Sequence, residues 1–201
     1  MFTGIVKGLA KVMQVIPKES YLRYSVELPG ELLAGLEKGA SVSIDGVCQT
    51  VVAIEEREVF FDAIGETLSR TTLDALAPGR EVNIERAAKL GDEIGGHLLS
   101  GHIFGTAVLQ KVEGNIYTFS HPHEWTRYLF PKGYVVIDGT SLTLVAVQKG
   151  TFTVHLIPET LQRTTLGNKA VGERVNLEFD ALIQAAVETV ERILYEQKNL
   201  R

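Results

Sequence analysis

The chain has 201 residues, of which 45% are hydrophobic and 22% charged, a composition that excludes disordered, collagen-like and purely coiled-coil proteins. Its net charge of −5 argues against a nucleic-acid partner, because nonspecific affinity for phosphate backbones comes from clustered Lys and Arg. The single cysteine, Cys48, cannot form an intrachain disulfide, which favours a reducing compartment.

The first residues, Met1 to Gly8, lack the basic stretch and the long apolar run of a secretory signal. No segment approaches the roughly 18 apolar residues of a membrane span. We therefore expect a cytoplasmic protein with no membrane partner. Length alone allows one domain or two small ones.

Short strands are expected throughout the first half of the chain. A helical stretch at 31–38 follows Pro29, and residues 42–54 are rich in β-branched residues interrupted by Asp45-Gly46, a dipeptide typical of tight hairpin turns. The polar octad 66–73 comes next. Several short strands at regular spacing predict a small sandwich or barrel.

The second half repeats the first. Between 43–86 and 136–179, 19 of 44 positions are identical at an offset of 93 residues. The starts of the two halves correspond at an offset of 97, where 3–8 resembles 100–105. The chain is therefore interpreted as two tandem modules. The join lies near 86–99, where glycines cluster among charged residues.

The second module also carries a helical stretch at 124–130, a hairpin at 135–147 with Asp138-Gly139 at its turn, and the octad 159–166. After it, Asp180 can cap a helix whose apolar residues are Ile183, Val187, Val190 and Ile193/Leu194. This helix has no counterpart in the first module. Its apolar stripe either packs on the modules or meets the same helix in other subunits, and we favour the second alternative.

Alternate residues of a strand share a face, so Cys48 and Thr50 point the same way, as do Ser141 and Thr143. Each module thus presents a nucleophile-type group beside a hydroxyl. The alternative is that these small side chains fill a narrow barrel. The repeat of polar character at both positions weighs against that alternative.

The octads are nearly identical although they are charged and rich in hydroxyl groups. Such a mixture suits a polyhydroxylated ligand. Two structural alternatives remain open: Glu66/Arg70 and Glu159/Arg163 are helix-surface pairs at i, i+4, or Thr67 and Thr160 are helix caps.

His97 and His102 lie in a glycine-rich segment, where the backbone can approach a ligand closely. A metal site with His121 and His123 is disfavoured, because the spacing matches no recognised ligand set. An acid/base or hydrogen-bonding role competes with a structural one. No nucleotide-binding fingerprint is present. Paired, similar but unequal pockets suggest two copies of one ligand, or two similar ligands.

Four features together resemble the riboflavin synthase family: the opening Met-Phe-Thr-Gly-Ile-Val, the segment 95–102, the paired Ile-Asp-Gly-x-[Cys/Ser]-x-Thr strands and the paired octads. The resemblance implies an all-β fold of two tandem six-stranded antiparallel barrels, at 1–90 and 97–180, plus an oligomerisation helix at 181–197. It also implies a homotrimer joined by that helix, with active sites between subunits, and no cofactor or metal.

The activity that the resemblance implies is the dismutation of two molecules of 6,7-dimethyl-8-ribityllumazine, by four-carbon transfer, to riboflavin and 5-amino-6-ribitylamino-uracil. The expected first-barrel contacts are Cys48, Gln49, Thr50, Asp62, Ala63, Ile64, Gly65, Glu66, Thr67, Gly101, His102 and Ile103. The expected second-barrel contacts are Lys132, Ser141, Leu142, Thr143, Ile157, Pro158, Glu159, Thr160, Leu161 and Gln162, with Gly4, Ile5 and Val6 from a neighbouring subunit.

Candidate catalytic residues are His102 for proton transfer, Cys48 or Ser41 for attack at C7 of the acceptor ring, Ser141 for orienting the second ring, and Asp180. The N-terminal Met1-Phe2-Thr3 is expected to help close the site. Gln49 and Phe104 depart from the usual pattern, which has leucine and aspartate there. The alternative function is a non-catalytic, fluorescent lumazine-binding carrier.

Overall fold

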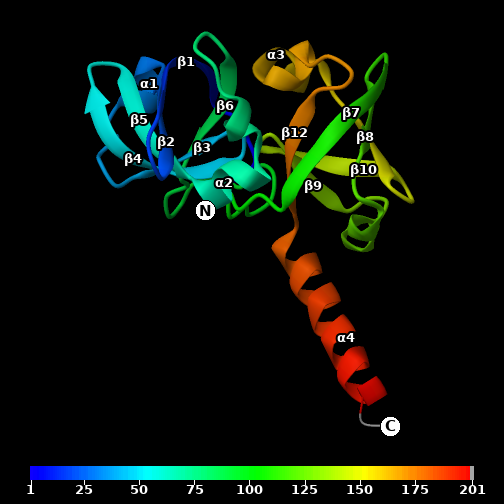
Figure 1. Cartoon of the computed structure of the whole chain (residues 1–201). Helices are drawn as coiled ribbons and strands as arrows, with labels where there is room; N and C mark the ends of the chain where they lie inside the picture. The colour runs from blue at the N-terminus through cyan, green and yellow to red at the C-terminus, as the bar shows by residue number, and fades with distance from the viewer. Residues whose placement is uncertain (200–201) are drawn as a thin grey trace.

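A computed structural model describes residues 1–199, which fold into two β-barrels side by side and a projecting C-terminal helix (Figure 1). The first barrel holds β1 (Gly8–Pro17), β2 (Tyr21–Glu27), β3 (Ser41–Ile44), β4 (Val47–Glu55), β5 (Glu58–Ile64) and β6 (Glu81–Arg86). The second holds β7 (Gly105–Glu113), β8 (Ile116–Ser120), β9 (Tyr134–Ile137), β10 (Thr140–Gln148), β11 (Thr151–His155) and β12 (Arg174–Phe179).

Both barrels are closed, antiparallel and identical in strand order. The order is β1-β2-β5-β4-β3-β6 in the first, and the second follows the same path when each strand number is raised by six. The β3–β4 hairpin turns at Asp45-Gly46 with φ of 46° and 84°, and β9–β10 turns at Asp138-Gly139 with φ of 45° and 81°. Two consecutive positive φ angles define the tight turn that the Asp-Gly pairs predicted. The duplicated all-β fold is therefore confirmed.

Each barrel has its own apolar core. Val26, Ile44 and Phe61 are among the fully buried residues of the first, and Leu109, Phe119 and Ile137 of the second. The alternation of buried and exposed residues along each strand puts these side chains inside the barrels.

The short helices differ from the sequence expectation. The predicted helix at 31–38 is the single turn α1 (Gly30–Leu33), and it stops before Gly35, which has φ of 64°. The predicted helix at 124–130 is the 3-10 helix η2 (His123–Tyr128). The octads form α2 (Gly65–Arg70) and α3 (Pro158–Arg163), each followed by a 3-10 turn, η1 (Thr72–Ala75) or η3 (Thr165–Asn168).

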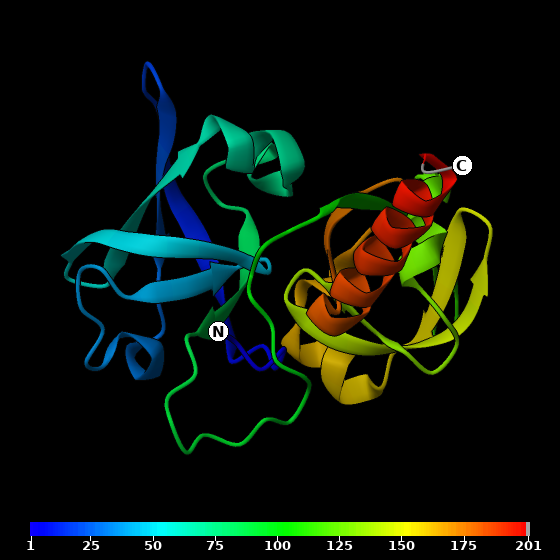
Figure 2. The same cartoon turned by 90° about the horizontal axis from the view of Figure 1, so that it is seen from below.

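The segment between β6 and β7 contains no helix or strand and runs beside the N-terminus (Figure 2). Phe2 and Leu99 exchange backbone hydrogen bonds of 2.9 and 3.0 Å across this junction. Their side chains form a small buried cluster with Val136, against which Cys48 packs. The start of the chain is therefore packed between the two barrels.

Two asparagines lock the barrels together in a reciprocal way. Asn83 Nδ2 donates to the backbone oxygen of Asp138, and Asn176 Nδ2 donates to that of Asp45, both at 2.8 Å. Their side-chain oxygens accept from the backbone N–H of Thr165 and Thr72. These residues pair at the 93-residue offset, so the interface has approximate twofold symmetry.

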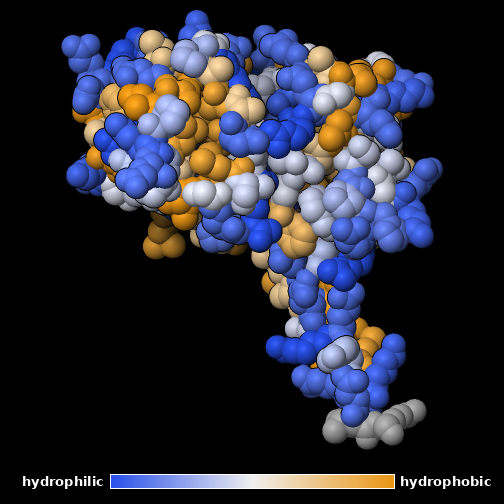
Figure 3. Space-filling model, in the orientation of Figure 1, coloured by the Kyte–Doolittle hydropathy of each residue, from blue (hydrophilic) through white to orange (hydrophobic). Residues whose placement is uncertain are grey.

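The final helix, α4 (Ala181–Asn199), projects from the second barrel (Figure 1). Asp180 Oδ1 accepts from the N–H of Leu182 and Ile183, which confirms Asp180 as its cap. Apolar residues remain exposed along the helix surface (Figure 3), with Val190 at 55% and Leu194 at 53% exposure. Among the described residues, no helix is both long and apolar enough to span a membrane.

Candidate active site

A buried carboxylate fixes the segment that precedes each barrel. Glu85 Oε1 accepts hydrogen bonds from the N–H and hydroxyl of Thr3 at 2.6 and 2.7 Å, and Oε2 accepts from Gly4 N–H at 3.1 Å. Glu178 does the same for Ser100 and Gly101, at 2.8, 2.8 and 3.1 Å. Burial raises the pKa of both carboxyls.

Each anchored segment then lies against a strand of the opposite barrel. The N–H of Ser141, on β10, donates to Gly4 O at 2.9 Å, and that of Cys48, on β4, donates to Gly101 O at 2.8 Å. A Cβ at Gly4 would come within 2.6 Å of Ser141 Cβ, and one at Gly101 within 2.7 Å of Cys48 Cβ. Both sites require glycine. The expectation that a neighbouring subunit supplies Gly4 is wrong, because Gly4 of the same chain already fills that position.

Cys48 and Ser141 lie outside the barrel cores. On β4, Val47, Gln49 and Val51 are buried whereas Cys48 is half-buried and Thr50 exposed. Ser141 and Thr143 on β10 repeat that pattern. The shared faces are therefore confirmed, and the alternative that these side chains fill the barrels is wrong.

The side chains of two predicted contacts point into the barrels. Gln49 is 6% exposed and its amide donates to Cys48 O, while its side-chain oxygen is buried without a hydrogen bond. Leu142 belongs to the second core. Neither side chain therefore lies on the outer face that Cys48 and Ser141 share.

His97 adds a polar group to the second-barrel site. Its Nδ1 lies 2.7 Å from Ser141 Oγ, and its ring stacks on Tyr134 with 4.9 Å between centroids. Burial lowers the pKa of His97, which keeps the imidazole neutral near pH 7, and Asp180 partly opposes this shift. A neutral imidazole can accept the Ser141 proton, so this pair can move a proton at Ser141 Oγ.

A cavity of about 770 Å³ lies against the first barrel, between β4, α2, the 100–104 segment and the start of α4. It brings together predicted site residues from three separate segments. These are Cys48, Glu66, Thr67, Gly101, His102 and Ile103. The imidazole of His102 is exposed, and its backbone N–H donates to Ser100 Oγ at 3.1 Å.

Other predicted residues lie outside this cavity. Asp62 is paired with Arg23 through two hydrogen bonds of 2.8 Å, Ala63 is buried in the first core, and Ser41 pairs with Thr50 across β3 and β4. The remaining first-barrel predictions, Ile64 and Gly65, lie at the junction of β5 and α2.

The predicted second-barrel contacts lie at α3, on β10 and just before β9. Ile157 is the N-cap residue of α3, and α3 contains the other five residues of 157–162. Thr143 pairs across strands β10 and β9 with Tyr134, whose ring stacks on His97. Lys132 has φ of 70° and donates its N–H to Leu144 O.

The octads also form the helix-surface ion pairs left open above. Arg70 pairs with Glu66, and Arg163 with Glu159, at i, i+4. All four side chains are more than half exposed, so each pair contributes only roughly 0.2–0.5 kcal/mol. Thr67 and Thr160 are not caps: Thr71 and Thr164 instead accept from the N–H of Leu73 and Leu166.

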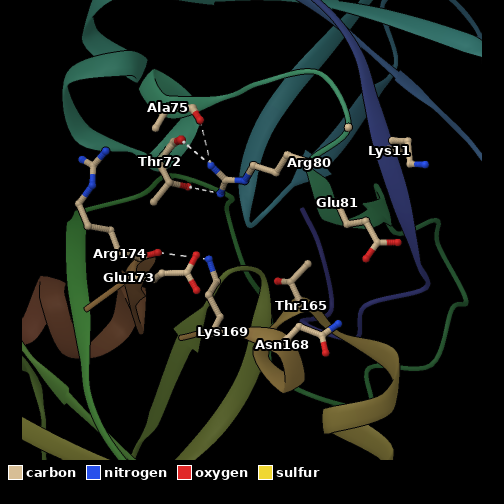
Figure 4. Close-up of a pocket in the computed structure, with 11 residues that line it drawn as sticks. Lys11, Thr72, Ala75, Arg80, Glu81, Thr165, Asn168, Lys169, Glu173 and Arg174 are labelled. Atoms are coloured by element: carbon tan, nitrogen blue, oxygen red, sulfur yellow. Dashed lines mark hydrogen bonds between the residues drawn. The ribbon is translucent and has the colours of Figure 1, made fainter. Parts of the chain in front are cut away.

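A second cavity, of about 720 Å³, opens between the barrels (Figure 4). Arg80, which lines this cavity, donates hydrogen bonds to the carboxylate of Asp45 and to the backbone oxygens of Thr72 and Ala75. Lys169 forms an ion pair with Asp138 at 3.2 Å. The innermost cations thus compensate buried carboxylates, and no predicted site residue lines this cavity. Within residues 1–199, no three His, Cys, Asp or Glu side chains gather as metal ligands.

Known proteins match nearly the whole chain. The family model of the Lumazine binding domain matches residues 3–87 and again 100–180. The chain is 50% identical to the riboflavin synthase of Escherichia coli (strain K12) over 204 residues, covering 99% of this chain and 96% of that one. It is 48% identical to the riboflavin synthase of Chlamydia pneumoniae, covering 96% and 97%.

The chain belongs to the riboflavin synthase family. As a member of that family it is an enzyme, a transferase. Solved structures of LumP, in complex with riboflavin and with flavin mononucleotide, are 26% and 25% identical and superpose with TM-scores of 0.81 and 0.80. They cover 90% of this chain and 100% of theirs.

Sequence reasoning missed three parts of the site. Glu85 and Glu178 recur at the 93-residue offset, so the repeat itself could have identified them. His97 was singled out but not assigned, because its contact with Ser141 joins residues 44 apart. The residues of α4 that line the first-barrel cavity carried no signal in the sequence.

Proposed function

We propose that this riboflavin synthase family member converts two molecules of 6,7-dimethyl-8-ribityllumazine into one riboflavin and one 5-amino-6-ribitylamino-uracil. A four-carbon unit passes from one lumazine to the other. The reaction is a dismutation, so its atoms balance without an external oxidant or reductant.

The observation that carries this proposal is the reciprocal duplication of the site. Cys48 beside Gly101 and Ser141 beside Gly4 are built alike, down to the carboxylate that holds each glycine segment. Two similarly built contacts with unequal reactive groups, Cys48 in one and Ser141 in the other, suit two copies of one substrate that play different roles. The 50% identity with a riboflavin synthase supports the same substrate.

The chemistry requires one lumazine to lose a proton from its 7-methyl group and the other to be attacked at C7. The methyl is acidic because its carbanion delocalises into the ring, so a neutral imidazole or an ordered water is a sufficient base. We assign proton transfer to His102, with Cys48 or Ser41 as candidate groups at C7. Ser141, held by His97, orients the second ring together with Thr143. Holding the two rings face to face supplies much of the acceleration.

The proposal includes the assembly. The exposed apolar residues of α4 support a homotrimer joined through residues 181–197, with a first-barrel site (from 1–90) facing the second-barrel site (from 97–180) of a neighbour. We further propose a cytoplasmic location and a reaction that requires no cofactor or metal.

The second candidate is a non-catalytic carrier, which the likeness to LumP in complex with riboflavin favours. The test is to incubate the purified protein with the ribityllumazine in EDTA and to follow riboflavin by absorbance and chromatography. Riboflavin formation is expected. Fluorescent retention of unchanged lumazine would favour the carrier, and formation only with added metal would contradict the cofactor-free reaction.

A further inference from the structure

One face of α4 forms part of the wall of the first-barrel cavity. Ala181, Gln184, Ala185 and Glu188 all line it, and their spacing of three and four residues places them on one side of the helix. This face is separate from the apolar stripe that contains Val190 and Leu194. The first-barrel cavity therefore includes residues beyond the two matched domains, since the family model ends at residue 180.

Contacts with the second barrel hold this face in place. Tyr128 donates its hydroxyl to Glu188, and Arg127 pairs with Glu191 at 2.9 Å. Val187 packs against the second core. Because these groups attach the first turns of α4 to the second barrel, the cavity face keeps a defined position relative to Cys48 and His102.

Gln184 is the polar group that α4 contributes. Ala181 and Ala185 have no polar side-chain atoms, and Glu188 is engaged by Tyr128. Gln184 is half-buried, and within residues 1–199 no hydrogen bond joins its side-chain amide to another residue. An amide offers one acceptor and two donors, which match the hydroxyls of a polyol chain and the carbonyls of a heteroaromatic ring.

We propose that Gln184 is a binding residue of the first-barrel site and hydrogen-bonds the ring-and-polyol ligand held beside Cys48. The inference rests on the proposed function and adds a residue from α4 to it. Its consequence is that the helix with the exposed apolar stripe also contacts ligand, so affinity at the first barrel depends on the position of α4.

The test is an equilibrium titration of the full-length protein with 6,7-dimethyl-8-ribityllumazine, followed by ligand fluorescence. Gln184→Ala is expected to weaken first-barrel binding by about three- to tenfold, the effect of one neutral hydrogen bond. Gln184→Glu keeps the shape but loses both donors and adds a charge to a cavity that already contains Glu66 and Glu188, so it should weaken binding further. Gln197→Ala makes the same change on an exposed part of α4 and should bind as wild type does.

In the same titration, the change in binding that Ser141→Ala causes identifies which sites belong to the second barrel. Gln184→Ala should weaken binding by the same factor in that background, because the two residues act on different sites. Wild-type affinity in both Gln184 variants, or an equal loss in Gln197→Ala, would overturn the assignment of Gln184 alone. Failure of the wild-type protein to bind the ribityllumazine would instead overturn the proposed function.

Discussion

Two glycines, Gly4 and Gly101, bring the anchored segments into close contact with β10 and β4. Each has a positive φ, of 75° and 78°, and each lies where a Cβ would collide with Ser141 or Cys48. The repeat already showed that these glycines correspond. It could not show what they touch, because each contacts the strand of the opposite barrel.

Gly101→Ala is expected to lower the free energy of unfolding by more than the roughly 1–3 kcal/mol of backbone strain, because its Cβ would also collide with Cys48 and Phe2. Gly35→Ala is the matched control, since Gly35 has φ of 64° but open space around it. Urea denaturation of both variants measures the difference. Equal losses of unfolding free energy in the two variants would show that backbone strain alone explains the requirement for glycine at position 101.

His97 should set the acid limb of the pH profile. Burial lowers its pKa below 6.5, so the imidazole is neutral above that pKa and gains a proton as the pH falls through it. The protonated ring cannot accept from Ser141, so turnover should fall on the acid side. His97→Gln should lower turnover and flatten that limb. If the acid limb of the pH profile is unchanged in His97→Gln, a group other than His97 causes that limb.

Among the secondary-structure elements, the strands and hairpin turns agree closely with the sequence prediction, because the residues that determine them are neighbours in the sequence. Asp45-Gly46 and Asp138-Gly139 form the expected hairpin turns, and Asp180 caps α4. The short helices were less predictable. Gly35 ends α1 after one turn, and η2 takes 3-10 geometry. The role of the α4 face as a cavity wall depends on long-range packing, which no local pattern reports.

The apolar stripe of α4 should control the oligomeric state. Val190→Glu places a charge within the stripe and is expected to dissociate the assembly. Arg192→Glu introduces the same residue on the opposite side of the helix and should leave the assembly intact. Sedimentation velocity distinguishes the two outcomes. A wild-type protein that is monomeric at micromolar concentration would contradict a role for α4 in assembly.

At the scale of the molecule, the two barrels share a polar interface with buried charge. Asn83 and Asn176 cross it, and Asp45 and Asp138 lie beneath with 1% and 0% exposure. The repeat predicted the symmetry of these residues. It did not predict their counter-charges, because Arg80 and Lys169 occupy positions that do not correspond at the 93-residue offset.

Asn83→Ala should cost about 1–3 kcal/mol of unfolding free energy, because it leaves the Asp138 carbonyl and the Thr165 N–H without these partners. Asn168→Ala is the control, because Asn168 is an exposed asparagine that lines the cavity between the barrels. It should cost much less unfolding free energy. Chemical denaturation monitored by Trp125 fluorescence compares them. Similar costs for both variants would argue against an interlocking role.

Burial, together with Asp138, raises the pKa of Asp45 from 3.8 to about 7. The folded chain therefore holds this proton more tightly than the unfolded chain, and the contribution of Asp45 to stability falls as the pH rises from about 4 to about 7. The difference in unfolding free energy between wild type and Asp45→Asn should decline over that range and level off above it. A rising difference for Asp45→Asn would contradict the raised pKa.

The reaction itself is tested by the stoichiometry of a complete turnover with purified protein and 6,7-dimethyl-8-ribityllumazine in EDTA. The proposed dismutation of two copies of one substrate predicts one riboflavin and one 5-amino-6-ribitylamino-uracil for every two lumazines consumed. Stable binding of the lumazine with no riboflavin formed would contradict the account.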